Sequence, residues 1–363
     1  MIIPVCFIIG FTLFQFLVVL TNLFFKDNLN SPDSKFNGLV SVLIPARNEE
    51  LNIESILTCL QRQDYKNIEI LVFDDQSTDR TGEIVRQFIK QDNRIKLIES
   101  GGLPPGWLGK NHACHELSKR AKGKYLLFVD ADVFLSKNII IQTIATSEKY
   151  NLGLLSIFPI QEMQTLGERI TVPNMNFILL SLLPLILVRK TKYQSLTAAN
   201  GQFMFFKAAD YQQVFPHNKM KGSKVEDMEI ARYYKESNIR IACTTGDDRV
   251  SCRMYTDFNE AVNGFSKNII SFFGNSFILA LMFWLITTAG IIVVYLGTGT
   301  GVFLSYLLLF IIIRILISLI SRQNIFLNFL YIIPQQLSLG IIFIKAVSCK
   351  LKKEYLWKGR NIS

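Results

Sequence analysis

Hydrophobic and polar positions divide the chain into three parts. Residues 2–25 carry no charged side chain, and neither do residues 268–313, whereas the part between them holds most of the charges. A helix needs about 20 apolar residues to cross a bilayer. The pattern therefore predicts one membrane crossing before a soluble domain and two after it, with a turn at residues 297–301 between the last two.

A further uncharged segment, residues 323–344, is interrupted by Pro334, Gln335 and Gln336. Three full crossings after the soluble domain would place the basic tail outside the cell, against the positive-inside rule. We therefore expect this segment to be broken, re-entrant or on the membrane surface, with the tail in the cytoplasm. The expected parts are an anchor at 1–26, a cytoplasmic domain at 27–268, a membrane region at 269–345 and a basic tail at 346–363.

Strand and helix patterns alternate in the soluble part. Short apolar runs rich in β-branched residues recur from Leu39 onward, and each is followed by apolar residues at helical spacing. This alternation predicts right-handed βαβ units and a mostly parallel sheet. Ligands bind at the carboxyl ends of the strands of such a sheet. Polar residues that follow the expected strands should therefore lie together: Arg47-Asn48-Glu49, Asp74-Asp75, Asp130 and Asp132.

Charge and cysteine content restrict the setting of the protein. The net charge is +10, and basic residues such as Lys26, Lys267 and Lys345 lie beside the apolar runs. This arrangement suits an anionic membrane surface and a cytoplasmic domain. No basic run with interleaved aromatic residues occurs in the soluble part, so the charge does not indicate nucleic-acid binding. The six cysteines form no C-x-x-C pair, which fits a reducing compartment.

Two segments admit more than one interpretation. Residues 177–188 are apolar but too short to span a membrane, so they form either a core helix or a membrane-surface segment. The basic residues that follow favour the surface. His112, Cys114 and His115 are too close together for a usual zinc site, and we interpret them as side chains at a helix start.

Asp130 and Asp132 follow an apolar strand and are separated by one residue. Such a pair can hold Mg²⁺ or Mn²⁺ together with substrate phosphates, and the metal would neutralise charge on a departing nucleoside diphosphate. The same pattern also occurs in solvated loops. Glu226 and Asp227 precede a helical pattern, where a carboxylate can act as a general base or simply favour the helix N-terminus.

Four segments together resemble the family 2 glycosyltransferases. They are "VSVLIPARNEE", "ILVFDDQSTDRT", "GWLGKNHACHELSKRAKGKYLLFVDAD" and "VEDMEIARYYKESN", and they match in order and spacing over residues 39–240. The resemblance implies the GT-A fold, an α/β Rossmann-like domain with a mostly parallel sheet that binds a nucleotide-diphospho-sugar. The flanking apolar runs are similar to the transmembrane helices of family members that act on lipids.

The resemblance also implies roles for individual residues. Asp227 would be the base of an inverting transfer, and Asp130 and Asp132 would bind the Mn²⁺ or Mg²⁺ ion. Asp75 would contact the nucleotide base, most often uracil, and Lys110 would approach the diphosphate or the sugar. The other positions implied at the donor or acceptor are Pro45, Arg47, Glu49, Asn200, Gly201 and Gln202, with Asp130 also at the donor.

One departure from the family bears on the product. Processive polysaccharide synthases carry a Q-x-x-R-W motif before their C-terminal spans, and this chain has none. The segments "PPGWLGK", "CRMY", "AVNGFSKN" and "WKGR" instead resemble a narrower bacterial group associated with carotenoid and hopanoid pathways, which includes the diaponeurosporenoate glucosyltransferases. This implies a polyisoprenoid acceptor. An acceptor that is a carboxylic acid is already ionised, so Asp227 would matter less for it.

We therefore expect a multi-pass protein of the cytoplasmic membrane that transfers one hexose from a nucleotide-diphosphate donor, a UDP-sugar, to a lipid. The alternatives are a polyprenyl-phosphate glycosyltransferase, a polysaccharide synthase and a scaffold that binds the donor without turnover. The joint presence of carboxylates at all the family positions argues against the scaffold. These are Asp75, Asp130, Asp132 and Asp227.

Overall fold

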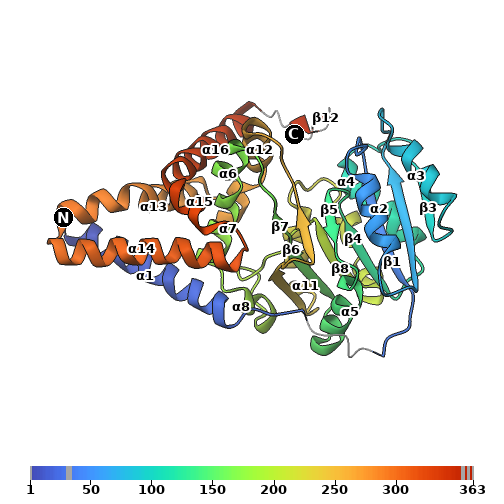
Figure 1. The fold of residues 1–363 in the computed structure, drawn as a ribbon, viewed down its shortest axis with the longest axis horizontal. Helices are drawn as coiled ribbons and strands as arrows, with labels where there is room; N and C mark the ends of the chain where they lie inside the picture. Colours follow the sequence, from blue (N-terminus) through green and yellow to red (C-terminus); the bar gives the residue numbers. More distant parts are fainter. Residues whose placement is uncertain (1, 30–34, 353–355, 358–359, 362–363) are drawn as a thin grey trace.

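The structure is a computed structural model that describes residues 2–29, 35–352, 356–357 and 360–361. Apolar helices project from one side of an α/β domain, and α1 starts at their far end (Figure 1). Within the described residues, four helices are long and apolar enough to cross a membrane. They are α1 (Ile2–Phe24), α13 (Phe277–Gly297), α14 (Thr300–Ile320) and α16 (Ile332–Lys352).

The α/β domain is built on a seven-stranded sheet in the order β3-β2-β1-β4-β8-β6-β9. Its neighbouring strands are parallel, except that β8 runs antiparallel to both β4 and β6. The expected mostly parallel α/β sheet is therefore confirmed, with one reversed strand. The strands are β1 (Val40–Ala46), β2 (Ile68–Asp74), β3 (Ile95–Glu99), β4 (Tyr125–Val129), β6 (Leu154–Phe158), β8 (Phe203–Lys207) and β9 (Ile241–Thr245).

The path of the chain between β6 and β8 explains the reversed strand. β6 ends at the same rim of the sheet as β1, β2 and β4, which we call the carboxyl rim. From there the chain builds α6 (Leu166–Thr171), α7 (Pro173–Leu182) and α8 (Leu185–Lys190) before it re-enters the sheet. Because it re-enters from the rim that it left, β8 must run in the opposite direction.

An apolar core lies on each face of the sheet, because successive strand residues point to opposite faces. In β1, Val42 and Ile44 belong to one core and Leu43 to the other. The core of Leu43 extends into the apolar helices, where it includes Val19 of α1 and Ile317 of α14. The domain helices that cover the sheet are α2 (Ile53–Gln61), α3 (Thr81–Ile89), α4 (Gly109–Arg120), α5 (Ile139–Tyr150), α9 (Ala208–Val214), α10 (Pro216–Lys219) and α11 (Glu226–Glu236).

A smaller sheet lies beside the carboxyl rim, with its strands in the order β5-β10-β7. It consists of β5 (Val133–Leu135), β7 (Ile160–Gln161) and β10 (Val250–Cys252). β5 begins directly after Asp132 and is antiparallel to β10, so Cys252 is paired with Val133. This pairing brings a distant part of the chain next to the turn that carries Asp130 and Asp132.

The apolar run 177–188 lies inside the protein, so the membrane-surface interpretation is wrong. It is divided into α7 and α8, and α7 is buried against α1, α14 and α16. Asn22 of α1 holds the point of division by donating to the carbonyls of Leu180 and Leu183. The same side chain accepts a hydrogen bond from the backbone N–H of Leu185. These bonds satisfy backbone groups that the helix break leaves unpaired.

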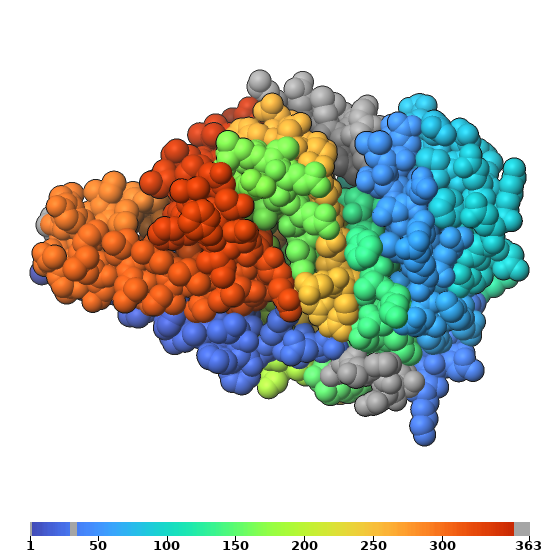
Figure 2. Space-filling model, viewed as in Figure 1, coloured from blue at the N-terminus to red at the C-terminus, as the bar shows by residue number. Residues whose placement is uncertain are grey.

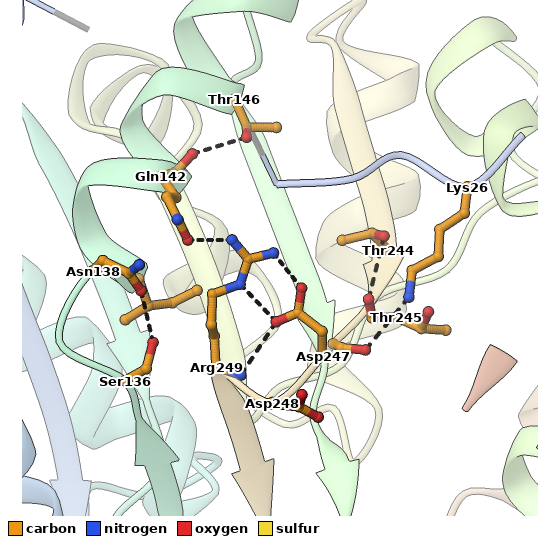
Figure 3. A network of polar contacts seen from close by, with 12 residues as sticks. Lys26, Ser136, Asn138, Gln142, Thr146, Thr244, Thr245, Asp247, Asp248 and Arg249 are labelled. Atoms are coloured by element: carbon orange, nitrogen blue, oxygen red, sulfur yellow. Dashed lines mark hydrogen bonds and ion pairs between the residues drawn. The ribbon is translucent and has the colours of Figure 1, made fainter. Parts of the chain in front are cut away.

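Polar contacts fasten the end of α1 to the α/β domain (Figure 3). Lys26 Nζ donates to the carbonyl of Gly246 at 3.5 Å, and Thr244 Oγ1 donates to the carbonyl of Asp27 at 2.6 Å. The side chain of Asp27 accepts two hydrogen bonds from Arg189 of α8, at 2.8 and 3.0 Å. The first residues after α1 are therefore bound to both β9 and α8.

The turn between β9 and β10 is itself anchored to α5 (Figure 3). The Arg249 guanidinium bonds to Asp247 within the turn and to Gln142 of α5. Burial lowers the pKa of Lys26 on the other side of this turn, and the charge of Asp247 opposes that effect. A connected set of polar contacts thus runs from the end of α1 to α5.

The last apolar segment is broken, although not at its proline. It forms α15 (Ile325–Leu330) and α16, and the two are separated at Tyr331. Pro334 lies in the first turn of α16, where the missing N–H removes no helical hydrogen bond. The break therefore precedes Pro334.

The C-terminal part of the chain lies on the side of the α/β domain. α16 packs against α12 (Phe258–Ser266) and η1 (Ile269–Phe273), which precede the first C-terminal span. The hairpin of β11 (Leu356–Trp357) and β12 (Arg360–Asn361) follows α16, and β12 lies beside the domain in Figure 1. The arrangement agrees with a re-entrant α15–α16 segment and a cytoplasmic tail, which stay predictions.

We predict that Asp27→Asn lowers the free energy of unfolding in detergent by about 1–3 kcal/mol, because it removes a charge-assisted pair that is mostly buried. Asp248→Asn is the matched control, since Asp248 pairs with Arg322 at an exposed site and should cost at most about 1 kcal/mol. Chemical denaturation followed by circular dichroism measures both. Equal costs for the two variants would show that the Asp27–Arg189 pair does not fasten α1 to the domain.

Candidate active site

Acidic residues from two segments surround one lysine from a third segment at the carboxyl rim. Asp130 follows β4, Glu226 and Asp227 open α11, and Lys110 is the second residue of α4. Lys110 Nζ lies 2.7 Å from Asp130 Oδ2, 3.8 Å from Glu226 Oε1 and 3.2 Å from the carbonyl of Gly201. The structure therefore brings together residues that the sequence analysis placed at the diphosphate, the metal and the base.

Lys110 is the positive charge that this cluster depends on. Burial by itself would lower the pKa of Lys110, but attraction by Asp130 and Glu226 raises it above its ordinary value. The ammonium group therefore stays charged. It partly neutralises the acids around it in a site that is only partly exposed to solvent.

One oxygen of the Asp132 carboxylate is buried, although a residue between two strands is often exposed to solvent. Burial raises the pKa of Asp132 to about 7, and the charges of Asp130 and Glu49 add to this. Its Oδ1 atom is buried without a hydrogen-bond partner among the described residues, while the Cys252 thiol bonds to the carboxylate. A buried carboxylate oxygen that lacks a donor is suited to a cation.

The donor set around Asp132 fits a divalent ion that takes most of its ligands from substrate and water. The described part of the chain holds no group of three or more His, Cys, Asp or Glu residues arranged to bind a metal. Mg²⁺ and Mn²⁺ prefer oxygen ligands and are commonly bound by one or two carboxylates together with phosphates. Asp130 and Asp132 supply such oxygens, so the residues present fit the ion that the sequence analysis expects.

Asp227 is held in place by backbone groups. Its Oδ2 atom accepts from the N–H of Gly201 at 3.0 Å, and its Oδ1 atom accepts from the N–H of Met228 at 2.8 Å. Burial raises the pKa of Asp227, and these hydrogen bonds oppose the shift. Burial also raises the pKa of the adjacent Glu226 to about 7, with Lys110 opposing and Asp227 adding to the effect.

The residues expected at the nucleotide lie at the ends of β1 and β2. Arg47 Nη1 donates to the carbonyl of Asp75 at 2.5 Å, and this contact joins the loops that follow the two strands. Asp75 is only 3% exposed, and Pro45 lies within β1. Glu49 donates its backbone N–H to the Thr81 hydroxyl at the start of α3. The structure thus gathers these four expected residues beside β4, which pairs with β1.

Gln202 has surroundings that the sequence analysis did not foresee. We expected Asn200, Gly201 and Gln202 to contact the sugar or acceptor, but the Gln202 side chain is buried. Its Nε2 donates to Cys252 Sγ at 2.7 Å, and its Oε1 accepts from Gln161 Nε2 at 3.2 Å. The "CRMY" segment contains Cys252, yet nothing in it indicated a contact with Asp132.

Gln161, Gln202 and Cys252 thus form a series of contacts that ends at Asp132. This series positions Asp132, the second aspartate of the D-x-D pair. The neighbouring Asn200 supports the same loop, because its Oδ1 accepts from the backbone N–H of Gln202 at 2.8 Å. Gly201 lies on the open side, where an added Cβ would come within 3.2 Å of Lys110 Nζ. The loop before β8 therefore packs tightly between the D-x-D turn and Lys110.

His112, Cys114 and His115 lie on α4 and pack with the loop that precedes it. The Trp107 ring stacks on His115 with centroids 5.1 Å apart and meets the edge of His112 at 5.6 Å. Burial lowers the pKa of both histidines. Asn111 of the same helix donates to the carbonyls of residues 220, 221 and 223, so α4 also positions the loop before α11.

We predict that Glu226→Gln stabilises the protein at pH 8 but not at pH 5. The pKa of Glu226 is raised to about 7 in the folded state, so the folded protein loses stability as the pH rises through 7 and Glu226 must ionise. Gln mimics the protonated acid, and the gain at pH 8 is expected to be on the order of 2 kcal/mol. Chemical denaturation with chelator present measures it.

The matched control is Glu229→Gln, which lies in the same first turn of α11. It should leave the difference between the two pH values unchanged. A Glu226→Gln effect of the same size at pH 5 and pH 8 would contradict the raised pKa.

Comparison with known proteins identifies relatives. Residues 41–215 match the family described as glycosyl transferase family 2. The chain is 27% identical over 234 residues to 4,4'-diaponeurosporenoate glycosyltransferase of Staphylococcus haemolyticus, covering 63% of this chain and 60% of that protein. The protein of the same name from Staphylococcus aureus strain USA300 is 24% identical over 276 residues, covering 72% of this chain and 69% of that one. This chain thus matches less than two thirds of the first relative.

A solved structure shares the fold. The mannosyltransferase PcManGT from Pyrobaculum calidifontis, in complex with GDP-Man and Mn²⁺, superimposes with a TM-score of 0.58 at 16% identity, covering 95% of this chain and 99% of that one. The α/β domain and the apolar helices are thus arranged as in a GT-A-like enzyme. Residues 41–215 of this chain thus match the glycosyl transferase family 2, and the two relatives above are named glycosyltransferases.

Proposed function

We propose that this protein transfers a single hexose from a nucleotide-diphosphate donor to a lipid acceptor drawn from the membrane. The observation that carries the proposal is the short connection between the acidic cluster and the apolar helices. Cys252 bonds to Asp132, and the next residue, Arg253, pairs with Glu168 of α6 at 2.8 Å. The chain continues from α6 into α7, which packs among α1, α14 and α16. The acidic cluster therefore lies close in the fold to the helices that would contact the bilayer and its lipids.

The donor would bind along the carboxyl rim. We infer a UDP-sugar, with Asp75 at the base and Arg47, Glu49 and Pro45 shaping the nucleotide pocket. Lys110 would contact the diphosphate or the sugar with its charged ammonium group. Gly201 supports this assignment, because its missing side chain leaves room beside Lys110.

Asp130 and Asp132 would hold Mn²⁺ or Mg²⁺. When bound, such an ion neutralises negative charge on the leaving nucleoside diphosphate. PcManGT contains Mn²⁺ in its structure, and we extend a divalent ion to this chain on the basis of its own buried and unsatisfied Asp132 oxygen.

The acceptor oxygen would attack the anomeric carbon as the bond to the diphosphate breaks, which inverts the configuration. Asp227 would orient the acceptor, and for a hydroxyl acceptor it would also take the proton. The names of the staphylococcal relatives point to an isoprenoid carboxylic acid, which we adopt as the acceptor class. A carboxylate is already ionised, so transfer to it needs no base.

The protein would reside in the cytoplasmic membrane with its α/β domain in the cytoplasm. The expected division into an anchor, a cytoplasmic domain, a membrane region and a basic tail agrees with α1, α13 and α14 as the spanning helices. The α15–α16 segment would enter and leave on the cytoplasmic side. Basic residues beside each apolar run support this orientation.

The transfer is tested with purified full-length protein in lipid extract that contains an isoprenoid acid. We expect label from a UDP-sugar to move into the organic phase only with Mn²⁺ or Mg²⁺ present. Asp132→Asn should lower this rate about 100-fold, since it weakens the binding of the ion that would neutralise the leaving group. Asp227→Asn should stay within about tenfold of the wild type.

Three results would contradict the proposal in different ways. A loss of more than 100-fold in Asp227→Asn would indicate a hydroxyl acceptor. Label in an aqueous polymer would indicate a polysaccharide synthase. Donor binding without turnover for any sugar nucleotide would indicate a scaffold.

The orientation is tested by placing a protease-cleavable tag at each end of the chain. We expect protease to remove the N-terminal tag in intact spheroplasts and the C-terminal tag only in inside-out vesicles. Cleavage of the C-terminal tag in intact spheroplasts would mean that α16 crosses the membrane fully.

A further inference from the structure

Arg314 is a charged residue within an otherwise apolar helix. It lies in α14 and is 6% exposed. Its Nε and Nη2 atoms are buried and have no hydrogen-bond partner among the described residues, and no carboxylate there forms an ion pair with it. A charged group in such surroundings is costly unless an opposite charge is supplied.

Aromatic rings stack against the Arg314 guanidinium but do not replace the hydrogen-bond acceptors that its N–H groups lack. Its central carbon lies 3.5 Å from the centroid of the Phe177 ring of α7 and 5.6 Å from that of Phe310. Stacking on a ring face attracts the cation, yet a ring face offers no oxygen to accept its N–H groups. The edge of the guanidinium that matches a carboxylate or phosphate thus stays without an acceptor.

Neighbouring polar side chains in the same helices behave differently. Asn174 of α7 donates to Ser338 Oγ at 2.9 Å, and Gln335 donates to Asn328 Oδ1 at 3.1 Å. Each of these side chains makes at least one hydrogen bond to another helix of this group, whereas the Arg314 side chain makes none. Asn174 Oδ1, Gln323 Nε2 and Gln336 Nε2 are also buried without a partner among the described residues, but each of those side chains makes another hydrogen bond, which the Arg314 side chain does not.

The position of Arg314 along α14 suits the polar end of a lipid. It precedes the last residue of α14, Ile320, by six residues, which corresponds to about 9 Å along the helix axis. The end of α14 is marked by Arg322, which pairs with Asp248 of the α/β domain. Figure 2 shows the green segment that includes α6 at the surface between the red C-terminal helices and the gold segment that precedes α13.

We propose that Arg314 binds the anionic group, a carboxylate or phosphate, of a long-chain membrane lipid on the cytoplasmic side of the helical bundle. This inference rests on the proposed membrane insertion of the chain. The anion would come either from the isoprenoid acid acceptor or from an anionic phospholipid, and both present the same chemistry to the guanidinium. Phe177 lies in α7, which packs against α6, and α6 carries Glu168, the partner of Arg253.

Native mass spectrometry of the full chain tests the proposal. The protein is released from nanodiscs of phosphatidylcholine that contain either geranylgeranoic acid or phosphatidylglycerol. We expect the wild type to retain one anionic lipid per chain. Arg314→Gln should lower that retention by about tenfold or more, because Gln keeps a polar side chain with N–H donors but has no charge. Arg314→Lys should retain an intermediate amount.

Arg322→Gln is the matched control and should keep the lipid, since it removes an arginine of the same helix end that already has a partner. Retention of geranylgeranoic acid alone would identify the acceptor as the ligand, and retention of phosphatidylglycerol would identify a structural lipid. Unchanged retention in Arg314→Gln, or equal retention of phosphatidylcholine, would overturn the proposal. A variant that does not fold is recognised by gel filtration, and Arg314→Lys then decides.

The test separates this inference from the proposed transfer. Asp132→Asn should retain the lipid as the wild type does, although its transfer rate should be about 100-fold lower. Wild-type turnover together with unchanged lipid retention in Arg314→Gln would contradict only the proposed lipid site. Loss of the lipid in Arg314→Gln, together with no turnover in the wild type, would contradict only the proposed transfer reaction.

Discussion

The whole structure depends on one constraint, which is that the chain leaves the sheet and returns to it at the same rim. The carboxyl ends of β1, β2, β4 and β6 meet there, so Arg47, Asp75 and Asp130 lie together although they are far apart in sequence. The excursion through α6, α7 and α8 starts at this rim and reverses β8. The rim that carries the acidic cluster is therefore also the rim from which the chain reaches the apolar helices.

The acidic cluster is compatible with folding because other parts of the structure stabilise it. Several partly buried carboxylates lie side by side, and Lys110 is the cation at their centre. Backbone N–H groups hold Asp227, and the Gln161–Gln202–Cys252 series holds Asp132. Like charges in such a site repel one another more than they would in bulk water, because protein replaces part of the surrounding solvent. The large shared core offsets that cost and leaves the acids positioned for a cationic or hydrogen-bonding ligand.

The α/β domain and the apolar helices are joined by both packing and polar contacts. The core around Leu43 extends to Ile317, and Asn22 and Asp27 connect α1 to α7, α8 and β9. Hydrogen bonds between helices at these positions fix the orientation that apolar packing alone would leave free. Arg314 is the contrasting case, because it is buried by the same helices and lacks a partner within them.

The sequence by itself determined the features that depend on local patterns. Strand–helix alternation identified the mostly parallel sheet, and the residues after its strands, such as Asp130 and Asp75, predicted the rim at which we propose that the donor binds. Uncharged runs of sufficient length identified the apolar helices, because helix length and composition can be read directly. The order of the motifs also carried the resemblance to the family 2 glycosyltransferases, whose family model matches residues 41–215.

Only the tertiary structure decided the contacts between distant segments. The pairing of β5 with β10 brings Cys252 to Asp132, and the packing of α7 against α1, α14 and α16 buries a run that was expected on the membrane surface. Neither follows from local periodicity, since an apolar run has the same pattern whether lipid or protein covers it. The partner of each buried polar group, and the absence of one for the Arg314 side chain among the described residues, depends on which elements pack together.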